Sequence, residues 1–394
     1  MAMNDLTVNQ ISTVLNAVYK QATGQTALAP ASTADFVAQA QTVLKTGYDN
    51  AINAISQVLS RTIFSVRPYN AKFDTIRVSE QRYGNHVRKI NYADKDFEND
   101  DRLPLTDGAS VDMYKINKPD VVQTNWYGET VFQKSITRFR DQLDVAFSNA
   151  EEFGQFIAGM MQNVSDQIEQ AHETLARGTV ANYIGAAYDL ATAETPVLAE
   201  RVVHLLTEYN SATGLSLTAT TVRQPDNFAP FIRWMYARIN QISSMLTERS
   251  AKYHLTLDKA LMRHTPYARQ RMLLYAGEMF NIASSVLSDT FNADFLKLAK
   301  YETVNYWQNI ANPQSIDVSY STAAADGTVA TGTASVDNIV GVLFDEEALG
   351  YTVVNQWVQP TPFNARGGYT NIFWHFTDRY WNDASENFVL FLLD

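Results

Sequence analysis

The chain has no cysteine among its 394 residues. Disulfide bonds, thiolate catalysis, zinc ribbons and iron–sulfur clusters all need cysteine, so the sequence excludes each of them. Long apolar runs are also missing. The longest, residues 388–393, has the length of a strand, whereas a membrane-spanning helix needs about 18 apolar residues. Residues 1–5 show no basic stretch followed by an apolar one, so we expect no secretory signal.

Basic residues are fewer than acidic residues. The chain has 31 Lys and Arg residues against 42 Asp and Glu, a formal net charge of -11. Proteins dedicated to nucleic acid usually carry a basic domain, so this balance argues against DNA binding as the main role. Hydrophobic residues make up 46% of the chain and charged residues 19%. These fractions predict a folded protein with ample core material rather than a disordered chain.

Motifs that mark catalysis or cofactor binding are absent from the sequence. There is no G-x-x-x-x-G-K-[ST] phosphate loop, no G-x-G-x-x-G fingerprint and no G-x-S-x-G nucleophile elbow. The six histidines form no H-E-x-x-H pair, which favours hydrogen-bonded or solvated histidine over metal ligation. The run Asp345-Glu346-Glu347 is more typical of a turn or helix start than of acid–base groups. We therefore predict no catalytic residue, no metal site and no cofactor.

Apolar residues at helical spacing predict several helices. A capping box at residues 148–151 begins the longest of them. If it runs to about residue 190, it spans roughly 60 Å at 1.5 Å per residue. The other helices are predicted over residues 9–20, 32–59 and 226–249.

Alternating β-forming and polar residues predict a long ribbon between residues 66 and 139. Its arms, residues 73–92 and 121–139, flank a charged, turn-rich tip at residues 94–108. Both arms are polar on both faces in places, so they cannot bury a full face in their own domain. Because a two-stranded ribbon is marginal alone in water, we expect it to lie on another subunit. Further strands are predicted as an exposed hairpin within residues 312–337 and as single strands at residues 369–381 and 388–393.

The C-terminal part of the chain carries the most specific pattern. It comprises GVLFD at 341–345, ALG at 348–350, NARGGYTNIFWHF at 364–376, Asp383, and SENFVLF at 385–391. This pattern resembles the C-terminal end of tailed-bacteriophage major capsid proteins of the Hong Kong 97 fold. The order of the preceding elements is also similar to that fold. The residue-level resemblance covers roughly the last seventh of the chain, and the order of elements covers nearly all of it.

The resemblance implies an α+β subunit. Its parts would be an N-terminal helical arm at 1–65, a β-hairpin E-loop at 66–139, a peripheral domain with the long spine helix at 140–225 and 346–394, and an axial domain inserted at 226–345. Many copies would assemble as hexamers and pentamers into an icosahedral head around double-stranded DNA, in weak non-specific contact with it. Scaffold, portal and decoration proteins would be further partners, and no membrane would be involved. The protein would reside in the virion after assembly in the host bacterial cytoplasm.

Two contacts between subunits are expected. The N-terminal helices carry apolar stripes but precede the recognisable fold by about 60 residues, so they are expected to bury Ile11, Val14, Leu15, Phe36 and Val43 across a subunit boundary. In the implied arrangement, the ribbon of one subunit crosses the spine helix of the next.

The distribution of charge fits such a crossing. Residues 61–140 hold 14 basic and 11 acidic side chains, whereas residues 141–220 hold 2 and 11. The candidate interface residues are Arg77, Arg82, Arg88 and Lys89 on the ribbon and Glu151, Glu152, Asp166 and Glu169 on the helix. An alternative with nearly equal support is that these basic residues pair with the acidic run of the ribbon's own tip, residues 94–101.

Two other functions stay open at this point. An encapsulin-type nanocompartment shell shares the fold but encloses a cargo enzyme, and the long ribbon and N-terminal arm favour a virus over it. An acidic, secreted carbohydrate-active enzyme belongs to another class, and the missing secretory signal counts against it. The aromatic content of 12% suits either a sugar-binding platform or an interface.

Overall fold

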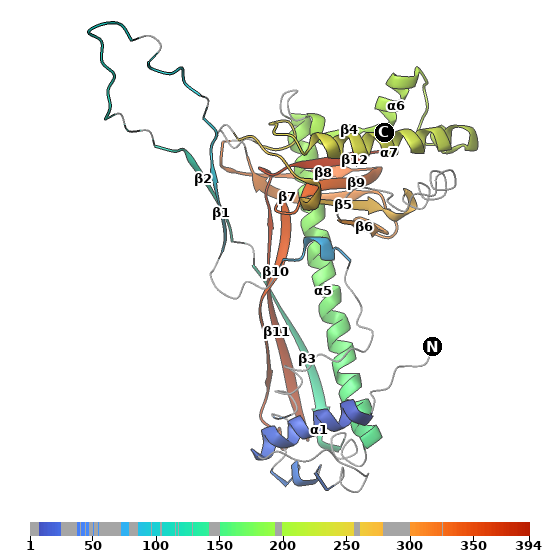
Figure 1. The fold of residues 1–394 in the computed structure, drawn as a ribbon. Coiled ribbons are helices and arrows are strands. Elements are labelled where there is room, and N and C mark those ends of the chain that lie inside the picture. The colour runs from blue at the N-terminus through green and yellow to red at the C-terminus, as the bar shows by residue number, and fades with distance from the viewer. Residues whose placement is uncertain are drawn as a thin grey trace.

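The structure is a computed structural model in which helices and strands are mixed (Figure 1). It describes residues 8–24, 38–39, 41–43, 45–46, 50, 54, 72–78, 86–95, 97–102, 105–114, 116, 118–127, 129–141, 150–193, 199–255, 261–278, 300–324 and 326–394. Helices of the short 3-10 type lie at Asp74–Ile76 (η1), Ala199–Arg201 (η2), Thr221–Arg223 (η3) and Tyr267–Arg269 (η4).

One long helix, α5 (Ala150–Ala193), connects the two ends of the molecule (Figure 1). Its 44 residues extend over about 66 Å at 1.5 Å per residue, and its bounds agree with the sequence prediction. Ala176, Val180, Ile184 and Ala187 are buried at helical spacing in the main core. The C-terminal half of α5 is therefore a core element.

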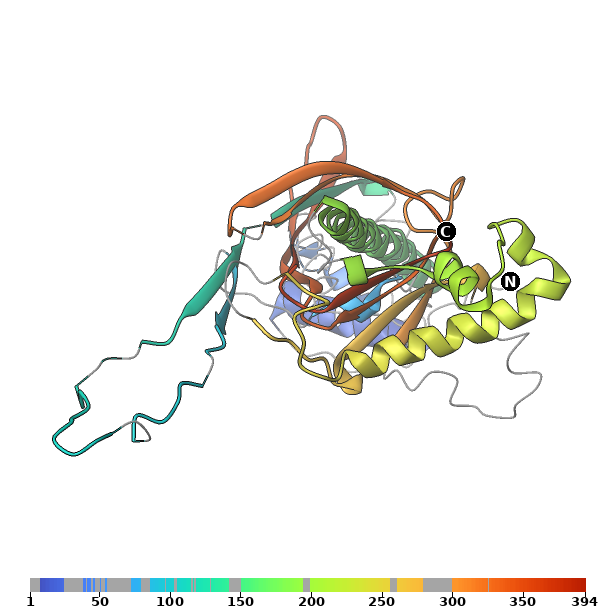
Figure 2. The same cartoon turned by 90° about the horizontal axis from the view of Figure 1, so that it is seen from above.

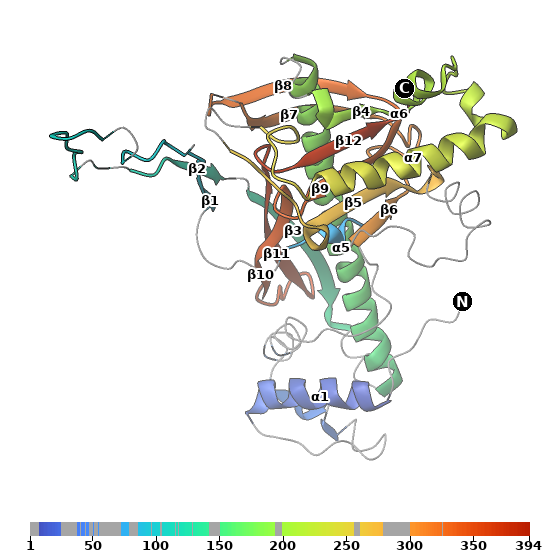
Figure 3. The ribbon, with the colours of Figure 1, turned by 45° about the horizontal axis from the view of Figure 1, so that its top comes forward.

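The other end of α5 carries helix α1 (Val8–Thr23), which packs against it (Figures 1 and 3). Leu15, Val18 and Val43 are completely buried within the subunit itself. The expectation that Leu15 and Val43 are buried across a subunit boundary is therefore wrong. The side chains of Ile11, Val14 and Phe36 lie outside the described residues.

An elongated antiparallel sheet lies beside α5. It has the order β10-β11-β3 and consists of β3 (Glu129–Phe139), β10 (Leu349–Pro360) and β11 (Tyr369–Asn382). Along β11, Thr370, Ile372, Trp374 and Phe376 are buried, and the residues between them are half-buried. The strand therefore presents one apolar face to α5, as its alternating sequence predicts.

A second sheet of five strands forms the centre of the upper part in Figure 1. Its order is β4-β12-β9-β5-β6, with β4 (Val202–His204), β5 (Gln270–Tyr275), β6 (Lys300–Val304), β9 (Ile339–Asp345) and β12 (Phe388–Leu392). Phe388, Leu390 and Leu392 face the core that contains α5. The residues between them face a second core with helices α6 (Leu205–Thr213) and α7 (Pro225–Met245). A sheet buried on both faces explains the continuous apolar run at 388–393.

Gly341 on β9 meets a requirement for close packing in this sheet. A Cβ atom at this position would lie 2.8 Å from the backbone oxygen of Leu273 on the neighbouring strand. Backbone cannot yield as a flexible side chain can, so glycine fits here and larger residues do not.

The structure differs from the sequence-based division at the C-terminus. Strand β12 pairs with β9 and β4, so it belongs to the same sheet as strands of the segment 226–345 and not to the sheet of β10 and β11. Thr265-Pro266 has the sequence of a helix start, with proline at the first helical position, but it precedes only the three-residue η4.

Two hairpins complete the fold. The hairpin of β7 (Ile316–Ala323) and β8 (Val329–Val336) packs against α5 and buries Ile316 and Val336 (Figure 3). The hairpin is therefore partly buried, whereas the sequence predicts an exposed hairpin. The other, β1 (Val87–Tyr92) with β2 (Val121–Trp126), is the ribbon that leaves the body of the subunit (Figures 1 and 2).

Candidate functional site

The ribbon ends in a tip without cover from its own subunit. Its paired part runs from Val87↔Trp126 to Tyr92↔Val121. Beyond this pair, every described residue from 97 to 120 is exposed, and Figure 2 shows the tip far from the body. The large apolar side chains exposed here include Phe97, Leu105, Val111, Met113, Tyr114 and Ile116. A concentration of exposed apolar side chains on one element marks an interaction surface.

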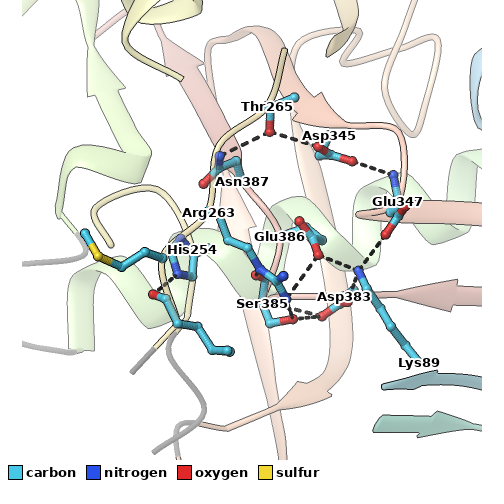
Figure 4. Close-up of polar contacts among 12 residues, drawn as sticks. Lys89, His254, Arg263, Thr265, Asp345, Glu347, Asp383, Ser385, Glu386 and Asn387 are labelled. Carbon is cyan, nitrogen blue, oxygen red and sulfur yellow. Dashed lines mark hydrogen bonds and ion pairs between the residues drawn. The ribbon is translucent and has the colours of Figure 1, made fainter. Parts of the chain in front are cut away.

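The base of the ribbon is attached to its own subunit by Lys89. The Nζ atom of Lys89 lies 2.9 Å from Oδ2 of Asp383, 2.5 Å from Oε1 of Glu386 and 3.2 Å from Oε2 of Glu347 (Figure 4). The side chains of Asp383 and Glu386 are 2% and 7% exposed. Burial by itself lowers the pKa of Lys89, but the attraction of Asp383 and Glu386 outweighs burial and raises the pKa above its ordinary value. Lys89 is thus a charged group bound at a buried anionic site.

The loop between β11 and β12 supplies this anionic site. Oδ1 of Asp383 accepts hydrogen bonds from the backbone N–H of Ser385 at 2.9 Å and from its hydroxyl at 2.6 Å. Arg263 donates through Nε to the carbonyl oxygen of Ser385 at 3.0 Å and lies 3.2 Å from Glu386. Burial raises the pKa of Glu386, although Lys89 and Arg263 act in the opposite direction. Hydrogen bonds between Asp383 and Ser385 and the cationic side chains of Lys89 and Arg263 hold the loop in place.

The same polar centre extends to the end of β9. Asn387 donates to Oγ1 of Thr265 at 3.1 Å, and Thr265 donates to Oδ2 of Asp345 at 2.9 Å (Figure 4). Nearby, Nε2 of the fully buried His254 lies 2.9 Å from the carbonyl oxygen of Leu261. Burial lowers the pKa of His254 to about 4, so the ring is neutral at neutral pH. Asp345, Asp383, Ser385, Glu386 and Asn387 all belong to the C-terminal pattern that the sequence analysis singled out, and their role is structural.

A second contact holds the ribbon just beyond its paired part. Asp94 accepts a hydrogen bond from Nη2 of Arg249 at 2.6 Å and one from the backbone N–H of Met262 at 2.9 Å. The hydrogen bond from Arg249 lowers the pKa of Asp94. Because Asp94 binds the α7 side of the subunit, it does not pair with the basic residues of the ribbon arm.

A cleft of about 800 Å³ opens beside the ribbon base, between β1, β2, the segment that follows η1, and β10. Trp126, Trp381 and Val353 form an apolar part of its wall. Arg77 and Arg88 also line it, and both are exposed. No ion-pair partner for either arginine occurs among the described residues.

The structure places the predicted interface residues as follows. The backbone of Arg77 bridges to Tyr351, Arg88 lies on β1, and Arg82 lies outside the described residues. Lys89 binds Asp383 and Glu386 of its own chain instead of standing free for a neighbour. These partners are 294 and 297 residues away, so no local sequence signal could have paired them.

The acidic candidates all lie on α5. The backbones of Glu151 and Glu152 are helical, but their side chains lie outside the described residues. Asp166 is half-buried. A carboxylate oxygen of Glu169 lies 3.9 Å from Nδ1 of His172 one turn further along the helix. Their pairing with a neighbouring subunit remains a prediction.

Two kinds of site are not found in the part of the chain that the structure describes. These residues include no group of three or more His, Asp or Glu side chains arranged to hold a metal ion. None of their helices combines the length and apolar character that crossing a membrane requires.

Comparison with known proteins gives a consistent result. A family model described as "Phi29-like phage major capsid protein" matches residues 15–392. No match was found among curated proteins.

Two solved structures share the fold. The capsid structure of Staphylococcus phage Andhra has a TM-score of 0.56 at 12% identity, over 84% of this chain and 87% of that chain. A chain in the structure of the head fiber and inner core protein gp22 of native bacteriophage P68 has a TM-score of 0.53 at 10% identity, over 84% and 87%.

Proposed function

The chain belongs to the Phi29-like phage major capsid protein family, since the family model covers residues 15–392, and on this premise we propose how its structure builds a phage head. As a member of this family it is a structural protein of the virion, and its copies associate into the capsid shell of a tailed phage. This membership selects the phage head over the encapsulin-type compartment and the carbohydrate-active enzyme.

The fold corresponds to the Hong Kong 97 type. Residues 1–65 form the arm, residues 66–139 apart from β3 the E-loop, and α5 the spine helix. The peripheral domain comprises α5 with the sheet β10-β11-β3. The axial domain comprises the five-stranded sheet with α6 and α7, and therefore includes β4, α6 and β12 in addition to the inserted segment 226–345. The order of elements and the two separate sheets support this division.

The ribbon β1–β2 and its tip lie on a neighbouring subunit in the shell. The observation that carries this proposal is the set of exposed apolar side chains on an element that leaves its own body. Phe97, Met113, Tyr114 and Ile116 are each at least 79% exposed. Burial of such side chains stabilises a contact by roughly 1.5–3 kcal/mol each, which offsets the cost of ordering the tip. Lys89 and Asp94 fix the direction in which the ribbon leaves.

The shell consists of hexamers and pentamers and encloses double-stranded DNA. It assembles in the cytoplasm of the host bacterium, where scaffold, portal and decoration proteins are its further partners. The net charge of -11 keeps contacts with DNA weak and non-specific, because phosphates and an acidic wall repel each other. The protein needs no cofactor and catalyses no reaction.

Limited digestion with trypsin tests the position of the ribbon. In and beside the tip, the residues after which trypsin can cut are Lys95, Arg102 and Lys115, whereas Lys118 precedes Pro119 and is resistant. We expect trypsin to cut free subunits at these three residues and to leave them intact in assembled shells, because a neighbour covers them. Equal cutting of tips in free subunits and in shells would show that the tip stays uncovered, and would refute the proposed arrangement.

A further inference from the structure

We propose that the cleft beside the ribbon base receives the acidic tip of a neighbouring copy's ribbon, with Phe97 as the apolar anchor. The inference rests on the proposed function, in which the ribbon lies on a neighbour, and adds the place where its tip binds. The occupant is a second copy of this chain.

The cleft has an uncompensated positive charge. Four basic and two acidic residues line it. Arg271 pairs with Glu346, and Lys89 lies 3.2 Å from Glu347, so both acidic residues are bound. Arg77 and Arg88 remain, exposed and without an ion-pair partner among the described residues. The cleft therefore favours an anionic occupant.

The wall of the cleft also contains apolar surface. Trp126 is half-buried there and donates through Nε1 to the carbonyl oxygen of Asn382 at 2.7 Å, which fixes its ring. Trp381 and Val353, each 9% exposed, continue the apolar wall. The volume of about 800 Å³ lies within the roughly 300–1,000 Å³ of clefts that bind small molecules, so the cleft has room for an aromatic side chain. An occupant with one aromatic ring and negative charge beside it fits these features.

The ribbon tip has this composition. Phe97 has a relative exposure of 106%, the highest of any apolar side chain in the described residues. It lies in a run of five carboxylates and two basic residues at positions 94–102. Asp94 and Asp100 pair with Arg249 and Arg102, and Asp101 is exposed. Since Phe97 is fully exposed, it does not fill the cleft of its own subunit, and the cleft of another copy can receive it.

The spine helix is a poorer source of the occupant. Glu169 already faces His172 on the same helix, at 3.9 Å, and Asp166 is half-buried. A rigid helix surface also cannot insert into a cleft as a narrow tip can. The tip supplies both the negative charge and the aromatic ring that the cleft accommodates.

Crosslinking in assembled particles tests the inference. The chain has no cysteine, so introduced cysteines are the only thiols in the protein. Particles are prepared with the full-length double variant Phe97→Cys/Arg88→Cys and treated with a short bismaleimide. The matched control is Phe97→Cys/Ile310→Cys, because Ile310 is 78% exposed on another surface. We expect crosslinked dimers to form several-fold faster in the first variant than in the control.

A second measurement covers the case in which the cysteine variants do not assemble. A photoreactive benzoylphenylalanine at position 97 keeps an aromatic ring there, and mass spectrometry locates its crosslinks. Crosslinks between chains to residues 72–78, 86–90 or 346–353 support the inference. Crosslinks between chains to other regions overturn the inference but leave the ribbon on a neighbour. Crosslinks only within one chain, or none in intact particles, overturn both the inference and the proposed arrangement.

Discussion

Lys89 shows how a single residue sets the direction of the ribbon. Its ammonium group lies between Asp383 and Glu386, which are nearly inaccessible to solvent. Two buried carboxylates that repel each other are tolerated only with a cation between them. The ribbon therefore cannot rotate about its base without uncovering buried charge.

Replacement of Lys89 by Met is expected to destabilise the subunit. Loss of one partner from a buried ion pair costs roughly 3–5 kcal/mol. We expect a decrease near the lower end of that range, because Arg263 still neutralises part of Glu386. Urea denaturation measures the free energy of unfolding. The control is Lys95→Met, since exposed Lys95 donates only to the carbonyl oxygen of Lys118 in the described contacts. If both variants lose the same small amount, Lys89 is not an anchor.

His254 predicts a loss of stability in acid. Its pKa in the folded subunit is about 4, whereas its ordinary value is 6.5. Between pH 6.5 and 4 the unfolded chain therefore binds a proton that the native state does not, so stability falls as the pH decreases through this range. The difference of about 2.5 pKa units corresponds to about 3 kcal/mol.

The variant His254→Gln isolates this contribution. A glutamine amide can donate to the carbonyl oxygen of Leu261 and does not titrate. The free energy of unfolding is measured at pH 7 and at pH 4 for both proteins. Its decrease from pH 7 to pH 4 should be about 3 kcal/mol smaller in the variant than in the natural protein. Parallel pH curves for the two proteins would mean that folding does not lower the pKa of His254.

At the scale of elements, the ribbon divides into an anchored base and an exposed tip. Removal of residues 97–116, with a short glycine turn in their place, keeps Lys89, Asp94 and all of β1 and β2. The shortened chain should keep its urea midpoint, because the deleted part is exposed and contributes little to the core. Electron microscopy should then show no closed shells. Unfolding of the shortened subunit would show that the tip belongs to its own core.

Helices and strands with a strong period were predictable from the sequence. The apolar stripe of α5 and the alternation along β11 gave bounds close to those of the structure. A period of 3.6 residues fits an amphipathic helix, and a period of 2 residues fits a strand with one buried face. The sheet membership of β12 was not predictable, since an apolar run buried on both faces carries no information about its neighbours. The partners of Lys89 were also not predictable, because the contact closes a loop of almost 300 residues. Sequence reasoning thus identified a ribbon but made it too long, because residues 129–139 pair with β11 and residues 74–76 form a 3-10 helix. It did not identify the site that holds the ribbon.

At the scale of the whole molecule, we expect assembly to depend on charge, because the exposed Arg77 and Arg88 are proposed to face an acidic surface of a neighbouring subunit. The double variant Arg77→Glu/Arg88→Glu should fold normally and assemble more slowly. Each exposed pair is worth only about 0.2–1 kcal/mol, but every subunit repeats it, and electrostatic complementarity mainly sets association rate and register.

Light scattering over a range of salt concentrations measures this rate. From about 50 to 500 mM salt the Debye length falls from about 14 to 4 Å, so assembly of the natural protein should slow. Assembly of the double variant should not slow, because its glutamates repel the acidic partner and salt screens that repulsion. The second reversal Asp101→Lys should restore part of the rate if the tip is the partner. Glu169→Lys should restore it if the spine helix is the partner. If the arginine variant assembles at the normal rate at every salt concentration, the charges of Arg77 and Arg88 do not contribute to assembly.

The central claim is that this subunit forms a phage head in which each ribbon lies on a neighbour. Electron cryomicroscopy of particles purified with the full-length protein tests it most directly. The account predicts a closed shell in which the tip residues Phe97, Tyr114 and Ile116 are covered by an adjacent copy while Lys89 stays bound to Asp383 and Glu386 of its own chain. A shell in which each ribbon folds back onto its own subunit, or in which the tips remain in solvent, would contradict it.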